Sequence, residues 1–193
     1  MIKKLLITIL FLSWLANPFW AIAETYGSDV ITGGTVSCDT QYDGTTYACT
    51  NSVDRNESTF WMTTKTANPH WWKYDLGSGV SKSIDKLSIM VRNDGSGAQL
   101  KDFTFQGSND GTSWTTIGTS QAADLATGYQ DFTYTNPNSY RYYTATSTGN
   151  TWNTGEGGTN NVYIALFEVK GYECTDCDVV APIPLMKIFL WWL

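Results

Sequence analysis

The sequence is poor in histidine and in positive charge. Its 193 residues include one histidine, His70, and 12 lysines and arginines against 18 aspartates and glutamates, so the formal net charge is −6. No basic cluster offsets this acidity locally, and like charges repel. We therefore expect no nucleic acid partner, and strongly anionic membranes are disfavoured. Neutral sugars carry no such penalty.

The common catalytic signatures are also missing. The sequence contains no nucleophile elbow, phosphate-binding loop, dinucleotide fingerprint or His-Glu-x-x-His zinc motif. A Ser-His-Asp arrangement would have to use His70, and no serine lies in a recognisable strained turn. Glu156 and Asp94 could supply the two carboxylates of a glycosidase, but nothing specific pairs them. The chain is predicted not to be an enzyme.

No apolar run reaches the ~20 residues that a membrane-spanning helix needs. The N-terminal run from Leu5 to Leu15 follows Lys3 and Lys4, is interrupted at Asn17-Pro18, and precedes the small-residue site Ala21-Ile22-Ala23. This order is typical of a cleaved secretory signal, so residues 1–23 are predicted to be a signal peptide and the protein to be secreted or displayed at the cell surface. Cleavage would remove two lysines and change the net charge to −6 − 2 = −8.

The remainder, about 170 residues, is enough for one domain with its own core. Its last part, residues 175–193, is predicted to be an apolar tail that contains Pro182 and Pro184. The prolines and the length of this tail exclude a spanning helix. An interfacial anchor, a docking strand and a reading frame extended past its natural stop remain open.

Four cysteines, Cys38, Cys49, Cys174 and Cys177, are present. In an exported chain they predict two disulfides, with three possible connectivities. The Cys174-Thr175-Asp176-Cys177 spacing could instead indicate a metal or redox site. A zinc site would need a second close pair of ligands, and prolines rather than a helix follow the motif. Structural disulfides are therefore favoured.

Helical periodicity is absent after residue 23, and alternation of period two replaces it. The pattern appears in three places, where every second residue is set apart from its neighbours: Leu87, Ile89 and Val91; Phe103 and Phe105; and Tyr163, Ala165 and Phe167. Turn sequences such as Asn93-Asp94-Gly95 and Asn109-Asp110-Gly111 separate them. Many short half-buried strands without helices predict an all-β antiparallel sandwich.

Four segments in register resemble one known family. They are Asp54-Arg55-Asn56-Glu57-Ser58-Thr59-Phe60-Trp61, Trp71-Trp72-Lys73-Tyr74-Asp75-Leu76-Gly77, residues 103–114 and residues 164–174. Together they resemble the discoidin, or coagulation-factor C-type, domain, whose bacterial relatives include carbohydrate-binding module family 32. The resemblance covers residues 48–174, with residues 24–47 adding an N-terminal strand and loop. It implies a jelly roll of about eight strands.

The resemblance also implies a structural calcium ion and a disulfide that joins the domain ends. The metal ligands would be Asp54, Asn56, Thr59 and Glu168, whose oxygens suit a hard cation. The end-joining bond would link Cys174 to Cys38 or Cys49, with a local Cys38–Cys49 bond as the alternative. Two features depart from the pattern: Arg55 stands where the family has glycine, and Asn56-Glu57-Ser58 is a glycosylation acceptor.

Relatives in this family bind sugars with loops at one end of the sandwich, near the calcium ion. An aromatic face and a few hydrogen-bonding side chains would hold such a ligand. The candidate ligand-binding residues are Trp152, His70, Trp72, Arg92, Asn93 and Trp61. Trp71 is expected in the core, with Trp72 facing the opposite way, and Trp114 is also expected in the core.

The sequence is thus predicted to be a secreted, non-catalytic carbohydrate-binding module for galactose-like sugars of a glycan or polysaccharide. The alternative is a cell-adhesion or extracellular protein-binding module that uses the same loops on a cell-surface protein. A lipid-surface binder is disfavoured by the acidic charge.

Overall fold

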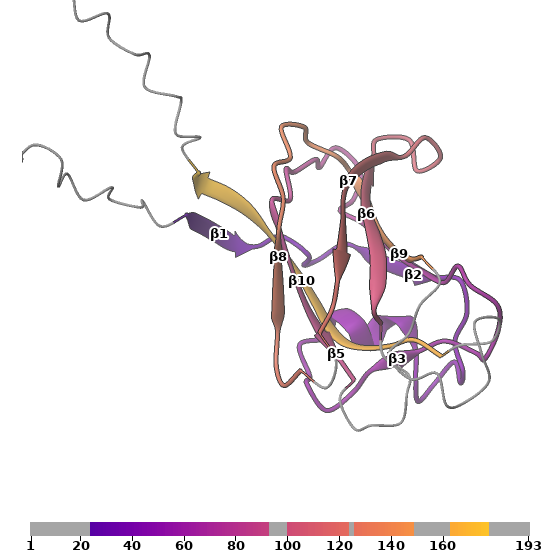
Figure 1. Ribbon diagram of the computed structural model, residues 1–193. Coiled ribbons are helices and arrows are strands. Elements are labelled where there is room, and N and C mark those ends of the chain that lie inside the picture. Colours follow the sequence, from indigo (N-terminus) through magenta and orange to yellow (C-terminus); the bar gives the residue numbers. More distant parts are fainter. Residues whose placement is uncertain (1–23, 93–99, 124–125, 149–162, 178–193) are drawn as a thin grey trace, which may run out of the picture.

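Ten strands and one short 3-10 helix make up the computed structural model, which describes residues 24–92, 100–123, 126–148 and 163–177 (Figure 1). The predicted signal peptide and most of the tail lie outside these residues. None of the helices in the described ranges has the length and apolarity to cross a membrane.

The strands form two antiparallel sheets of five strands each. The elements in chain order are β1 (Thr25–Asp29), β2 (Thr35–Cys38), η1 (Cys49–Val53), β3 (Trp61–Met62), β4 (Trp71–Asp75), β5 (Lys86–Val91), β6 (Asp102–Ser108), β7 (Thr115–Gln121), β8 (Gln130–Thr133), β9 (Tyr142–Ser147) and β10 (Ala165–Asp176). The first sheet has the order β1-β10-β5-β8, with β3 also paired to β10, and the second has the order β2-β4-β9-β6-β7. The predicted antiparallel sandwich is confirmed.

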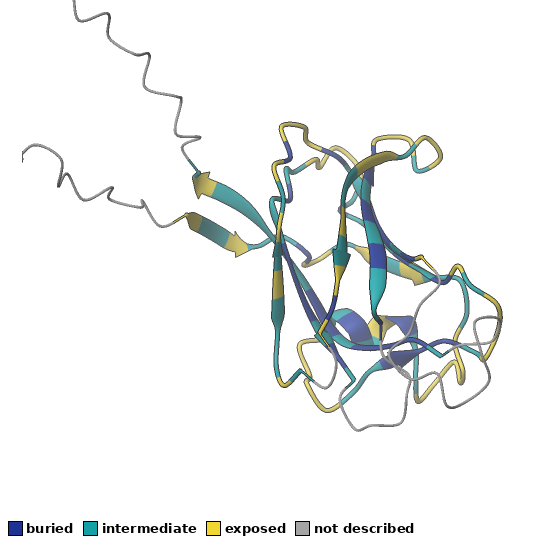
Figure 2. Ribbon diagram, viewed as in Figure 1, coloured by how far each residue is buried: buried dark blue, intermediate teal, exposed yellow. Residues whose placement is uncertain are grey.

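The core lies between the two sheets, and in β5 and β6 its large apolar residues are alternate residues of the strand. Leu87, Ile89 and Val91 of β5 are buried, and so are Phe103 and Phe105 of β6. Figure 2 shows the buried residues of the sandwich in dark blue. Period two explains this arrangement, because successive side chains of a strand point to opposite faces. The alternation seen in the sequence therefore identified these core positions correctly.

Strand β10 joins the two ends of the described domain. It is 12 residues long and pairs with β1, β3 and β5. Thr25 at the start of β1 lies opposite Asp176 at the end of β10. The first and last strands of the described domain are thus held side by side in one ladder (Figure 1).

The disulfides are local. Cys38 at the end of β2 pairs with Cys49 at the start of η1, and Cys174 pairs with Cys177. The expected bond between Cys174 and Cys38 or Cys49 is therefore wrong, and the alternative Cys38–Cys49 bond is confirmed. The β1–β10 pairing already holds the ends, so no covalent link is needed there.

Candidate functional site

The loop between η1 and β3 turns back on itself through side-chain hydrogen bonds. Asp54 Oδ1 accepts a hydrogen bond from the Asn56 amide at 2.9 Å, and its Oδ2 accepts one from Thr59 Oγ1 at 2.7 Å. The Asn56 carbonyl accepts from the Thr59 amide at 3.0 Å. Oxygens of all three residues therefore lie on one curved segment.

Glu168 of β10 reaches this segment from the other side. Its side chain is fully buried, and its Oε1 accepts a hydrogen bond from the Asn56 amide at 3.1 Å. Burial raises the pKa of Glu168; Arg55 opposes that rise, and the adjacent Asp54 carboxyl adds to it. The four residues predicted as metal ligands thus lie together. They include only two carboxylates, and the described ranges contain no group of three or more His, Cys, Asp or Glu side chains that could hold a metal.

Arg55 adopts the left-handed conformation that glycine favours, with φ of 63°. Its guanidinium forms ion pairs with Asp29 and, at 2.8 Å, with Glu168 Oε2. It also donates hydrogen bonds to the carbonyls of Ile31 at 2.5 Å and Val169 at 3.2 Å. Arg55 therefore partly compensates the negative charges of Asp29 and Glu168, and it links the 54–59 loop to the end of β1 and to β10.

Three of the predicted sugar-binding side chains are buried. Trp61, Trp72 and His70 are each only 1% exposed. The indole N–H groups of Trp61 and Trp72 donate to Thr40 O and Ser52 Oγ, both at 2.9 Å, and His70 Nδ1 lies 2.5 Å from Asp39 Oδ2. The prediction that these side chains contact a ligand is wrong, because the fold already uses their apolar and polar surfaces.

Of the other predicted sugar-binding residues, the structure describes only Arg92, which lies at one end of the sandwich. Arg92 follows β5 and is half-buried, with its guanidinium carbon 4.9 Å from the Phe60 ring centroid. Asn93 and Trp152 lie outside the described residues. Around Phe60, Tyr47 packs at 4.8 Å between ring centroids, and Tyr42, which is 53% exposed, packs at 5.8 Å against Tyr47. This end therefore carries a partly exposed aromatic cluster beside a cation.

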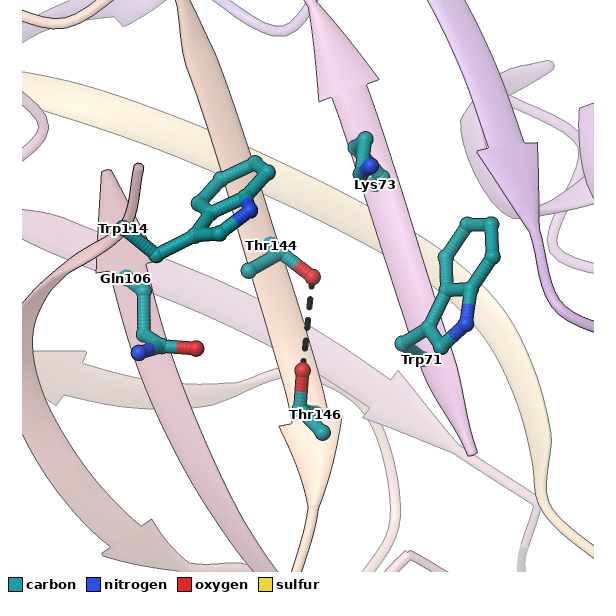
Figure 3. A pocket seen from close by; sticks show the side chains of 6 residues that line it. All are labelled: Trp71, Lys73, Gln106, Trp114, Thr144 and Thr146. Carbon is teal, nitrogen blue, oxygen red and sulfur yellow. Dashed lines mark hydrogen bonds between the residues drawn. The ribbon is translucent and has the colours of Figure 1, made fainter. Parts of the chain in front are cut away.

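A groove lies on the outer face of the second sheet. Its volume is about 210 Å³, and its lining residues are Trp71, Lys73, Gln106, Trp114, Thr144 and Thr146. Figure 3 shows the indoles of Trp71 and Trp114 on opposite sides, with Thr144 and Thr146 between them. Lys73 Nζ lies 5.0 Å from the ring centroid of each indole. An aromatic wall of this kind can cover the C–H face of a small polar ligand.

This groove was not predicted from the sequence, because the residues of β4 expected to face the core are those that face outward. Trp71 was expected in the core, yet it faces outward, and Trp72 is the core residue. Lys73 and Asp75 share the parity of Trp71, and these charged residues could have marked the outer face. Trp114 was also expected in the core, but it precedes β7 and lines the groove.

Comparison with known families identifies the central part of the chain. Residues 51–145 match the family model described as the NedA-like, galactose-binding domain of the F5/F8 type C group. These residues form a galactose-binding-like domain. The match includes the 54–59 loop and strands β3 to β8, and it confirms the resemblance to the discoidin family.

Solved structures with the same fold as this galactose-binding-like domain include carbohydrate-binding modules. Chitosan-binding module 1 of a Paenibacillus sp. IK-5 chitosanase/glucanase shares 22% identity, with a TM-score of 0.59, and the match covers 76% of this chain and 100% of the module. The family 32 module of Clostridium perfringens NanJ, solved with galactose, shares 18% identity with a TM-score of 0.60, covering 78% of this chain and 100% of the module.

A third module, the family 32 domain of AlyQ in complex with 4,5-unsaturated mannuronic acid, shares 19% identity with a TM-score of 0.57, covering 77% of this chain and 98% of that domain. Among curated protein sequences, none matches the chain. At these identities the structural likeness establishes the fold.

Proposed function

We propose that the protein is an exported, non-catalytic carbohydrate-binding module that recognises galactose-like sugars on a glycan or polysaccharide. The observation that carries this proposal is the match of residues 51–145 to a galactose-binding domain family. The modules with the same fold are described with chitosan, galactose and a uronic acid as ligands or targets. Binding residues are found disproportionately on loops that a rigid scaffold such as this sandwich holds in place.

The loop end near β3 is the proposed galactose site. Arg92 and the aromatic cluster of Tyr42, Tyr47 and Phe60 support this placement, because a sugar needs an apolar face and a few polar donors. Asn93 directly follows Arg92 in the sequence, and Trp152 is proposed to contribute a further aromatic face. One monosaccharide buries little surface, so binding at a single site should be weak and gain from multivalency.

A glycan array with the purified protein tests this function. We expect signal on galactose-terminated glycans, and loss of that signal in the Trp152→Ala and Arg92→Ala variants. Val80→Ala is a matched control, because Val80 is an exposed apolar side chain on the turn between β4 and β5. No signal on any glycan, combined with binding to a cell-surface protein, would replace this proposal with the adhesion alternative.

We further propose that Asp54, Asn56, Thr59 and Glu168 hold a structural calcium ion. The support is chemical: oxygen atoms of all four residues lie together, and the two carboxylates among them share one nearby cation, Arg55, which also pairs with Asp29. Calcium would supply the missing positive charge and link the 54–59 loop to β10 in the folded state only.

Thermal melting with calcium and with a chelator tests the metal proposal. Free calcium at 100 times its Kd should stabilise the fold by about 2.7 kcal/mol, which raises the Tm by several degrees for a domain of this size. The Asp54→Ala variant should lose that shift. Equal midpoints for the wild-type protein in both buffers would contradict the proposal.

A further inference from the structure

Lys73 differs from four other cations of this acidic protein in its partners. Arg55, Lys82, Lys86 and Arg141 each lie within 3.3 Å of a carboxylate oxygen. Lys73 has no carboxylate partner anywhere in the described ranges; its Nζ instead faces the two indoles of Trp71 and Trp114 at 5.0 Å each. Such contacts attract the ammonium to the ring faces and leave its N–H groups available as donors.

The rest of the groove is polar but uncharged. Thr144 Oγ1 donates to the Trp72 carbonyl at 2.8 Å, and Gln106 Nε2 donates to Thr116 Oγ1 at 3.3 Å, which leaves the amide oxygen of Gln106 as an acceptor. None of the six lining residues is acidic. The groove therefore combines two aromatic walls, one positive charge and a few neutral hydrogen-bonding groups (Figure 3).

We propose that this groove is a second carbohydrate site, which binds a uronate residue of an acidic polysaccharide. The sugar ring would lie against the indole walls, and its carboxylate would accept a charge-assisted hydrogen bond from Lys73. The groove volume of about 210 Å³ suits one sugar ring of a chain that continues along the sheet. This inference rests on the proposed function as a carbohydrate-binding module, but it uses a face separate from the loop end.

Charge favours a uronate over a neutral sugar at this position. A hydroxyl would form an ordinary hydrogen bond with Lys73, whereas a carboxylate forms one that is roughly twice as strong. The net charge of −6 repels anions at long range, but charges beyond about 8 Å are largely screened at physiological ionic strength. One local contact is thus compatible with an acidic chain, unlike the extended charge matching that nucleic acid requires.

Calorimetry or chemical-shift titration with trigalacturonate and with its methyl ester tests the proposal, because esterification removes the negative charges and adds only one methyl group at each carboxyl. We expect the wild-type protein to bind the acid about tenfold more tightly than the ester. Lys73→Met should remove that preference while keeping an apolar stem between the indoles, and Lys73→Arg should retain it. Trp71→Ala and Trp114→Ala should weaken both ligands, with melting used to confirm that each variant is folded.

Lys170→Met is the matched control. Lys170 Nζ lies 3.8 Å from the Tyr129 ring centroid, so it is also a lysine over an aromatic face, but it belongs to β10 in the other sheet. Its replacement should leave trigalacturonate binding unchanged. Equal affinity for acid and ester, equal loss in the Lys170 and Lys73 variants, or no binding of either ligand would overturn the proposal.

The glycan array separates this result from the galactose site. A Lys73→Met protein that keeps its galactose signal, with no uronate preference in the wild type, would refute the second site alone. If the wild-type protein binds no carbohydrate at all, both the second site and the proposed galactose site would be refuted.

Discussion

At the scale of single residues, Arg55 has an unfavourable backbone conformation but forms two ion pairs. A residue other than glycine at φ of 63° is strained, yet this conformation directs the guanidinium between Asp29 and Glu168. Glu168 is fully buried; burial raises its pKa, and the Arg55 guanidinium opposes that rise. The strain of one backbone position is thus offset by ion pairs to two strands.

Replacing Arg55 by methionine should leave the buried Glu168 carboxylate undercompensated. We expect a loss of about 3 kcal/mol of unfolding free energy in chelator, as for other buried pairs that lose one partner. Calcium should recover more of this loss than it adds to the wild-type protein, because the variant cluster is more negative. Urea denaturation in both buffers measures the difference, and an equal calcium effect on both proteins would contradict the coupling.

Asp75 and Arg141 form a second residue-scale contact, on β4 and beside β9. Arg141 Nε and Nη2 donate to the two carboxylate oxygens of Asp75, both at 2.7 Å. These hydrogen bonds hold the pKa of Asp75 below its usual value. A carboxyl with a lowered pKa stabilises the fold above its unfolded pKa and loses this contribution as the pH falls through its folded pKa.

The Asp75→Asn variant should therefore be less stable than the wild-type protein at neutral pH. The difference should shrink as the pH falls below about 4, where Asp75 becomes protonated in the unfolded state and then in the folded state. Urea denaturation over this pH range measures the trend. A stability difference that grows on acidification would show that the ion pair is not its cause.

At the scale of strands, the sequence pattern predicts where strands form better than which way they face. In β5 and β6, apolar and polar residues alternate, and the buried face follows directly from that contrast. In β4, the neighbours Trp71 and Trp72 are alike, so these two residues alone do not show which face is buried, and only the charged Lys73 and Asp75 mark the outer one. Packing decides: Trp72 stacks on Tyr74 with ring centroids 6.0 Å apart and bonds to Ser52.

The proximity of the four proposed calcium ligands could be predicted from the sequence and the family resemblance. Asp54, Asn56 and Thr59 are close in sequence, and the family resemblance supplied Glu168, which is 112 residues from Asn56. The ion pairs of Arg55 could not be predicted, because they depend on where β1 ends relative to the loop. The groove needed three strands and a preceding turn to be placed together, which local spacing does not encode.

The contact between β2 and β4 gives an element-scale prediction. A Cβ atom on Gly34 would lie 2.2 Å from the Asp75 carbonyl oxygen, so Gly34→Ala must push the strands apart. We expect a loss of about 2 kcal/mol of unfolding free energy. Gly44→Ala is the control, since a Cβ there meets nothing within 4 Å. Similar stabilities for the two variants would contradict a close approach at Gly34.

At the scale of the whole molecule, the two disulfides should contribute unequally. Cys38 and Cys49 are 11 residues apart and connect β2 to η1, whereas Cys174 and Cys177 are only 3 residues apart at the end of β10. Restriction of the unfolded chain grows with loop length, so removing the first bond should cost about 3 kcal/mol and removing the second should cost less. Urea denaturation of two variants, each with one cysteine pair replaced by serines, tests this order. A larger loss of stability for the Cys174–Cys177 variant would contradict it.

The pairing of Thr25 with Asp176 has an architectural consequence. Opposed residues of an antiparallel ladder lie only about 5 Å apart, so the domain begins and ends at nearly one point. A unit with this property can be spliced into a surface turn of a larger host without spreading the host's backbone. The β1–β10 ladder thus makes the domain suitable for insertion into other proteins.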